Sequence, residues 1–107
     1  MENSQVVGEY LHKKLLALKD KYDVVKDVRG RGLLQGIEIE GSQNTDKFAL
    51  GQELYETMLR NGLITELESR KNLENVVVVM HPALITSKEN VDEAVEIIDK
   101  SLSACLK

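Results

Sequence analysis

The sequence predicts an α+β domain of two layers, in which a small, mostly antiparallel sheet of three to four strands is covered by about three helices. Segments at both ends and in the middle of the chain repeat apolar residues every three or four positions, as helices do. The segments between them are rich in valine and isoleucine, which favour strands. The expected order is helix, two strands, helix, one or two strands, helix. Because helices and strands do not alternate regularly, a parallel sheet is not expected.

The N-terminal part of the chain is predicted to form a helix and then a hairpin. From about Ser4 to Lys21 the apolar residues fall on one helical stripe, namely Val6, Val7, Tyr10, Leu11, Leu15 and Leu18. Between Val24 and Glu40 the pattern changes to two short strands joined at Gly30 to Gly32. We expect Gly30 and Gly32 to adopt backbone angles closed to other residues, and Gly36 to mark a bulge or a close approach of two backbones.

Two further helices are predicted from their end signals. The second helix is expected to begin at an N-cap, Thr45 or Asp46, and to end just before Gly62. Its buried side consists of Phe48, Leu50, Leu54, Met58 and Leu59. In the last helix, Thr86 and Glu89 have the spacing of a capping box. The apolar face of that helix consists of Val91, Ala94, Val95, Ile98 and Leu102.

The strands of the C-terminal half are less evenly marked. Leu63 and Ile64 are predicted to form a brief strand, and the charged residues from Glu66 to Glu74 an exposed loop or hairpin tip. The run from Val76 to Met80 is the clearest strand. Because its four consecutive valines leave no polar alternation, we expect both of its faces to be buried.

Composition restricts the classes of function. The chain has 107 residues, 42% of them hydrophobic and 30% charged, which fits one soluble globular domain. The formal net charge of -4, with both signs interleaved, argues against a nucleic-acid-binding surface. Cys105 is the only cysteine, which excludes a disulfide framework, and we expect it to be a small buried residue of the last helix. No apolar run is long enough to span a bilayer, and a cytoplasmic location is expected.

No catalytic constellation can be assembled from the residues themselves. The glycine-rich run from Val28 to Glu38 superficially resembles a phosphate-binding loop, but its glycines lead into a strand rather than opening a helix, so a structural role is favoured over phosphate or RNA binding. His12 and His81 are the only histidines and lack companions at a metal-ligand spacing, so no metal site is expected. We expect His81 to form local hydrogen bonds. Glu38 and Glu40 alternate with isoleucine residues, which is typical of a strand with a solvated face.

The same glycine-rich run carries a resemblance to a known family. Residues 29–38, RGRGLLQGIE, resemble the RGxGLMxGIE signature at the start of the small C-terminal domain of class III aminotransferases. Residues 7–18 are similar to the helix that precedes this signature, residues 62–64 resemble the GLL strand, and residues 82–94 resemble the PPLxITxxxIDEA segment. The resemblance therefore identifies residues 1–107 as such a small domain, without the large cofactor-binding domain, and closest to the acetylornithine and ornithine aminotransferase branch.

The resemblance implies an enzyme that uses pyridoxal 5'-phosphate to move an amino group from an amino acid or amine to a 2-oxo acid. In this family the Schiff-base lysine, the carboxylate partner of the pyridine nitrogen and the phosphate donors belong to the large domain. None of the lysines of this chain lies in a matching motif, so we expect no catalytic or cofactor-binding residue here and no activity of the isolated chain. The parent enzyme is expected to be a homodimer, with no nucleic-acid or membrane partner.

One substrate position is also implied by the resemblance. In the ornithine-type enzymes an arginine three residues before the first proline of the PPL motif binds the substrate carboxylate, and here Val79 occupies that position before Pro82. Either the carboxylate is held elsewhere or the substrate is an amine without one. Arg70 is a candidate for the mobile arginine that enzymes acting on omega-amines use, although its spacing is not that of the family. A stand-alone, non-catalytic binding or protein-interaction module is the alternative function.

Overall fold

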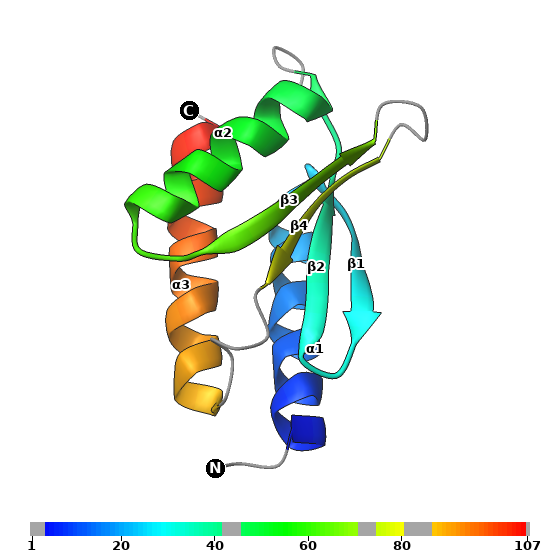
Figure 1. Cartoon of the computed structure of the whole chain (residues 1–107), viewed down its shortest axis with the longest axis vertical. Coiled ribbons are helices and arrows are strands. Elements are labelled where there is room, and N and C mark those ends of the chain that lie inside the picture. The colour runs from blue at the N-terminus through cyan, green and yellow to red at the C-terminus, as the bar shows by residue number, and fades with distance from the viewer. Residues whose placement is uncertain (1–3, 42–45, 71–74, 81–86, 107) are drawn as a thin grey trace.

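The computed structural model describes residues 4–41, 46–70, 75–80 and 87–106 (Figure 1). Within these ranges the chain forms three helices and one four-stranded sheet. The elements follow the predicted order and are α1 (Ser4–Lys21), β1 (Val25–Arg31), β2 (Leu34–Ile39), α2 (Lys47–Arg60), β3 (Thr65–Arg70), β4 (Asn75–Met80) and α3 (Lys88–Cys105). The α+β fold class is therefore confirmed.

The sheet is antiparallel throughout, with the strand order β1-β2-β4-β3. The two central strands are the hydrophobic ones. Since side chains alternate between the two faces of a strand, the register places Val28, Ile37 and Val78 on one face and their neighbours in sequence on the other. The face that carries Val28, Ile37 and Val78 is buried in the core.

The helices form the second layer. α1 packs on β1 and β2, α2 packs on β3 and β4, and α3 lies against both α1 and α2 (Figure 1). The core between the layers includes large side chains with no more than 1% of their surface exposed, among them Leu11, Leu15, Ile37, Leu54, Met58, Ile98 and Leu102. Burial of a Leu or Ile side chain contributes about 1.5–3 kcal/mol, so this single apolar layer accounts for much of the driving force for folding.

The helix ends follow capping chemistry, with one correction. Asp46 is the N-cap of α2, and its carboxylate accepts hydrogen bonds from the backbone N–H groups of Phe48 and Ala49 at 2.9 and 3.0 Å. The N-cap of α3 is Ser87, which accepts from the N–H of Asn90, so the prediction of Thr86 as the first cap was wrong by one residue. Thr45 and Thr86 themselves lie outside the described residues.

Three expectations about burial or strands were wrong. Leu59 is 49% exposed, because it lies one position beyond Met58 and turns away from the core. The third strand is Thr65–Arg70 rather than Leu63 and Ile64. The expected loop from Glu66 therefore begins with an edge strand, in which Leu67 alternates with charged residues. Val77 and Val79 of β4 are only half-buried, so this strand is buried on one face.

The hairpin between β1 and β2 depends on its glycines. Gly30 and Gly32 have φ angles of 110° and 55°, in the left-handed region that favours glycine, as the sequence predicts. Gly36 lies in regular register, and a Cβ there would come within 2.7 Å of the carbonyl oxygen of Val78 on β4. Gly36 therefore permits a close approach of two backbones, and the bulge of this hairpin lies instead between Val25 and Asp27. Pro82 lies outside the described residues.

In the part of the chain that the structure describes, no helix is both long and apolar enough to cross a membrane.

Candidate functional site

The sheet face that the helices leave uncovered is the surface on which the predicted substrate position lies. We call it the open face, and we define it by two cross-strand rows of paired residues, Arg29, Gly36, Val79 and Glu66 in one row and Asp27, Glu38, Val77 and Glu68 in the other. All four strands contribute to it. The rows alternate with the core-facing residues, as strand geometry requires.

Val79 lies in the middle of the open face, between Gly36 of β2 and Glu66 of β3. Side chains directly opposite each other on neighbouring strands come within about 5 Å at their Cβ atoms. A substrate carboxylate placed over Val79 would therefore meet the carboxylate of Glu66, while Gly36 offers no side chain at all. The geometry makes this position unsuited to holding a carboxylate, which agrees with the absence of an arginine there.

Arg70 is not brought to Val79 by the strand register. It is the last residue of β3 and pairs with Asn75, whereas the partner of Val79 on β3 is Glu66. Four residues of strand separate the two backbones by about 13 Å. The side chain of Arg70 lies outside the described residues.

The open face also contains a buried carboxylate, although the sequence pattern predicts a solvated strand face at this position. Glu38 is only 3% exposed, and its side chain forms ion pairs with Arg29 and, at 3.6 Å, with Lys26. Lys26 also approaches Glu40 at 3.7 Å. The interpretation of Glu38 as solvated was therefore wrong, because alternation with Ile37 and Ile39 shows only that Glu38 faces away from the core. Both basic residues come from β1 and cover Glu38 from the edge of the sheet.

A shallow depression of about 610 Å³ lies on the surface where α1 meets the hairpin, and it is lined by Gln5, Gly8, Glu9, His12, Gly30, Gly32 and Gln35. Gln35 is 3% exposed and donates hydrogen bonds to the carbonyl oxygens of Gly8, at 2.8 Å, and Gly32. The His12 ring lies 3.3 Å from the Gln35 side chain. Among the side chains that the structure describes, Glu9 lines the depression and no Lys or Arg does, so these residues do not favour an anionic ligand there.

The contact of α1 with the glycine turn was not visible in the sequence. A Cβ on Gly8 would lie 2.6 Å from the carbonyl oxygen of Gly32, so only glycine allows the helix to pack this closely on the turn. The glycine-rich run thus holds the hairpin against α1. A glycine within an otherwise good helix was the one signal that could have indicated this contact.

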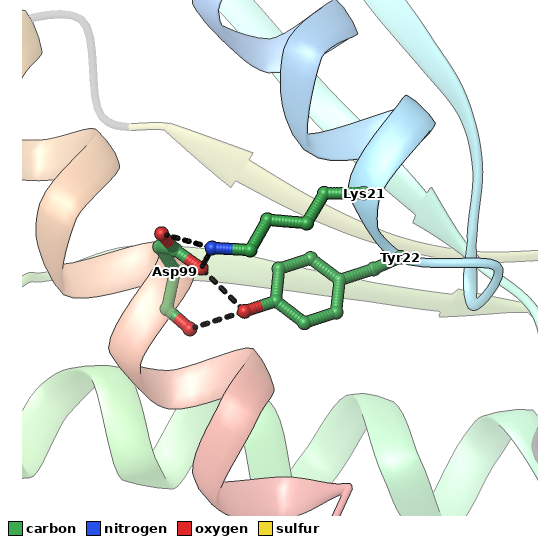
Figure 2. A network of polar contacts seen from close by, with 3 residues as sticks. All are labelled: Lys21, Tyr22 and Asp99. Carbon is green, nitrogen blue, oxygen red and sulfur yellow. Dashed lines mark hydrogen bonds and ion pairs between the residues drawn. The ribbon is translucent and has the colours of Figure 1, made fainter.

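A polar network joins the end of α1 to α3 (Figure 2). The Tyr22 hydroxyl donates to the Asp99 carboxylate, and Lys21 Nζ lies 3.0 Å from both Asp99 carboxylate oxygens. The hydrogen bond from Tyr22 holds the pKa of Asp99 below its usual value, and the bonds to Asp99 raise the pKa values of Tyr22 and Lys21. These shifts favour the protonated tyrosine and lysine and the ionised aspartate, which fits a structural link between the two helices.

Cys105 is half-buried on α3, rather than fully buried as expected, and its thiol contacts Thr57 Oγ1 at 3.6 Å. Burial raises the pKa of this thiol, so it is not activated as a nucleophile. No group of three or more histidine, cysteine or acidic residues with a metal-binding arrangement occurs among the described residues.

The part of the chain that the structure describes does not fit the cofactor that the resemblance implies. Pyridoxal phosphate requires a lysine for a Schiff base together with donors for its phosphate and a partner for its ring nitrogen. Lys21 and Lys26 are tied to acidic residues of their own neighbourhood, and Lys19 lies 4.0 Å from Asp27. No lysine is found among the described residues that line the depression beside the glycine turn. No step of cofactor chemistry is therefore assigned to this chain.

Comparison with known proteins gives a consistent result. The family described as aminotransferase class-III matches residues 1–102. The chain is 34% identical to an aminotransferase of Schizosaccharomyces pombe, over 100% of this chain and 24% of that protein. It is 32% identical to the acetylornithine aminotransferase of Caldanaerobacter subterraneus, over 96% of this chain and 23% of that enzyme. The chain thus spans about a quarter of the length of these relatives.

The fold is shared with solved structures of the same family. A transaminase from a marine Virgibacillus superimposes with a TM-score of 0.82 and 26% identity, over 97% of this chain and 24% of that structure. The agreement covers the helices and the sheet together, so it supports the whole domain rather than the glycine-rich signature alone. This chain belongs to the class III aminotransferase family.

Proposed function

We propose that residues 1–107 are the small C-terminal domain of a pyridoxal-phosphate-dependent class III aminotransferase, which transfers an amino group from an amino acid or amine to a 2-oxo acid. The observation that supports this most is the match of residues 1–102 to the family, combined with coverage of only about a quarter of the relatives' length. In the proposed parent, a cytoplasmic homodimer, the cofactor and the catalytic lysine are held by the large domain.

In this proposal the chain contributes structure to the enzyme and supplies no catalytic residue. Its helices and core make a rigid layer, and its open face presents Val79 and Glu66 to the rest of the enzyme. Because no cation is paired directly with Val79, the proposed parent either holds the substrate carboxylate elsewhere or uses an amine donor. The acetylornithine and ornithine branch remains our proposal for the nearest activity, with the donor and acceptor to be set by the large domain.

The test uses the full-length polypeptide that the gene encodes. We expect it to bind pyridoxal phosphate and to transfer an amino group to a 2-oxo acid, while the 107-residue chain, mixed with the same cofactor and substrates, does neither. Reduction with borohydride followed by peptide mapping locates the Schiff-base lysine. A covalent adduct on one lysine of the 107-residue chain, with turnover, would overturn the proposal.

The substrate position has its own test in the full-length enzyme. Val79→Arg alone is expected to form a cross-strand pair with Glu66, whereas Val79→Arg combined with Glu66→Gln leaves the guanidinium available for a substrate carboxylate. We expect only the double variant to improve kcat/KM for donors with an α-carboxylate, relative to amines. Equal effects of both variants, or none, would show that position 79 does not face the substrate.

A second function, a stand-alone binding module, is favoured by one observation. The open face and its margin expose Leu34 and Ile64, which are 58% and 53% exposed. A gene that encodes these 107 residues alone would support the module and contradict the enzyme fragment.

A further inference from the structure

One cross-strand row of the open face has a charged residue at each end and no charge in its middle. Arg29 on β1 and Glu66 on β3 are the two ends, and Gly36 and Val79 lie between them. Because neighbouring strands lie about 4.8 Å apart, about 14 Å separates the backbones of the two charged residues. A group that lies over Val79 is therefore next to Glu66 and remote from Arg29.

The guanidinium of Arg29 is already engaged within the domain. It forms an ion pair with Glu38, whose side chain is only 4% exposed. Lys26, at 3.6 Å, is the second cation beside the same carboxylate. Movement of Arg29 toward a ligand at Val79 would leave the buried Glu38 with one cation, which is unfavourable because a buried charge depends on its partners. Arg29 is therefore poorly suited to bind a substrate carboxylate over Val79.

The carboxylate of Glu66 is in the opposite situation. Glu66 is exposed, and in the described part of the chain it takes part in no ion pair. Directly across from it, Val79 is half-buried and offers a hydrocarbon surface that Gly36, on its other side, has no side chain to cover. The Cβ atoms of such a cross-strand pair lie about 5 Å apart. The row therefore presents a short apolar surface that ends in a carboxylate.

The charge of the open face as a whole favours a cationic ligand. Its two rows contain four acidic residues, Asp27, Glu38, Glu66 and Glu68, and one basic residue, Arg29. A surface dominated by one sign of charge raises the local concentration of ions of the opposite sign. A donor with two ammonium groups is therefore attracted more strongly than a monoamine, and a donor that also carries a carboxylate is attracted less.

We infer that Glu66 selects the amino donor of the parent enzyme, by binding the second ammonium group of a linear aliphatic diamine whose methylene chain lies over Val79. An ammonium group and a carboxylate form charge-assisted hydrogen bonds, whereas a carboxylate at this end of the donor would be repelled. This inference rests on the proposed function, in which Val79 lies beside the substrate, and it favours the amine donor among the alternatives stated there. Compared with acetylornithine and ornithine, the expected donor lacks the α-carboxylate.

The first experiment measures donor specificity in the full-length polypeptide. It compares three donors with the same number of carbon atoms, diaminobutane, butylamine and gamma-aminobutyrate, whose far ends are an ammonium, a methyl and a carboxylate group. We expect the highest kcat/KM for diaminobutane. Glu66→Gln should lower that value by about tenfold or more, mainly through KM, because one charged hydrogen-bond partner is lost. The value for butylamine should stay the same, and the value for gamma-aminobutyrate should stay the same or rise.

Glu68→Gln is the matched control. Glu68 lies on the same strand and face as Glu66 and is also exposed, but it pairs with Val77 rather than Val79. Its substitution should change kcat/KM for diaminobutane much less, because salt screens a charge that the donor does not contact. Both variants should keep the Tm of the parent sequence, since both side chains are exposed.

Three kinetic results would overturn the inference. Equal losses from Glu66→Gln and Glu68→Gln would show that the charge of the face acts without a specific contact. Equal losses for diaminobutane and butylamine in Glu66→Gln would show that the second ammonium group is not bound there. A preference of the unsubstituted enzyme for gamma-aminobutyrate over diaminobutane would show that this end of the donor is a carboxylate.

A binding measurement separates the inference from the proposed function. Diaminobutane is titrated calorimetrically into the full-length polypeptide after reduction with borohydride, so that no amino group is transferred. We expect saturable binding, with a Kd that rises by about tenfold in Glu66→Gln and stays the same in Glu68→Gln. A polypeptide that transaminates no donor but binds diaminobutane in this way would remove the proposed function and leave the ammonium site standing. An active transaminase in which neither binding nor donor preference depends on Glu66 would do the reverse.

Discussion

On the core face of the sheet, Ile37 and Val78 are completely buried under the helices. On the open face lie their neighbours in sequence, which include the charged Glu38 and the half-buried Val77 and Val79. The two faces belong to the same four strands, whose side chains alternate between them. The difference teaches that the hydrophobic pattern of β2 and β4 describes only the face that the helices cover. The open face carries charged residues, among them the buried Glu38 with its ion pairs, and exposed apolar groups, which that pattern does not record.

The largest expected effect contrasts two apolar residues of β2 on opposite faces. Ile37→Ala removes a fully buried side chain and should lower the free energy of unfolding by about 2–5 kcal/mol. Leu34→Ala removes a side chain that is 58% exposed and should change it by less than about 0.5 kcal/mol. Urea denaturation of the 107-residue chain measures both values. Similar losses for the two variants would show that the open face is covered in the isolated chain.

The next effect concerns the charges of the open face. Arg29→Met leaves the buried Glu38 carboxylate with Lys26 alone, and we expect a loss of about 1–2 kcal/mol, below the range for a fully buried pair because Arg29 is half-exposed. Adding Glu38→Gln to Arg29→Met should recover part of the loss, because the uncompensated charge is then absent. Chemical denaturation of the single and double variants measures the coupling free energy between Arg29 and Glu38. Fully additive effects of the two substitutions would contradict this prediction.

A smaller, favourable effect is expected on the core face. Among the described residues, the hydroxyl of Thr65 is the buried side-chain polar atom without a hydrogen-bond partner. Thr65→Val keeps the shape and removes this hydroxyl, and should raise the free energy of unfolding by about 1 kcal/mol. Thermal unfolding of Thr65→Val, compared with the control Ser103→Ala at an exposed position, shows whether the stability rises or falls. Destabilisation by Thr65→Val would mean that the hydroxyl has a partner in solution.

The smallest expected effect is the pH dependence of the network on the helix side, around Asp99. Because the folded state lowers the pKa of Asp99 below its usual 3.8, its contribution is present above that pH and is lost as the pH falls through the folded pKa. The raised pKa values of Tyr22 and Lys21 mean that their contributions are present at neutral pH and are lost at strongly alkaline pH.

Denaturation curves from pH 6 downwards, at about one-unit steps, measure this dependence. We expect the free energy of unfolding to fall less steeply at acidic pH in Asp99→Asn than in the control Asp20→Asn, which removes an exposed carboxylate of α1. An unchanged acid limb in Asp99→Asn would show that other carboxylates dominate acid unfolding.

Much of the fold could be predicted because its signals are local. The stripe of Leu11 and Leu15, the cap at Asp46 and the glycine at position 62 act within one or two helical turns, so the helices were placed almost to the residue. Edge strand β3 was missed because alternation of leucine with glutamate is equally typical of an exposed loop. The pairing of Thr65–Arg70 with β4 provides the hydrogen bonds that make it a strand.

The candidate site was only partly accessible from the sequence. Val79 could be named from the resemblance alone, but its neighbours could not, since Gly36 and Glu66 are 43 and 13 positions away and meet it only through strand pairing. The burial of Glu38 beneath Arg29 and Lys26 was hidden for the same reason. Cross-strand neighbours depend on register, and register follows from the packing of the whole sheet.

By itself, the sequence determined the class of fold, the positions of the helices and the family to which the chain belongs, because periodicity, caps and a glycine signature are written in consecutive residues. The tertiary structure decided which face of the sheet stays open, which carboxylate is buried there, and why Gly8 and Gly36 must be glycine. Those features arise where segments far apart in the chain come within a few ångströms of each other, and no local pattern records that distance.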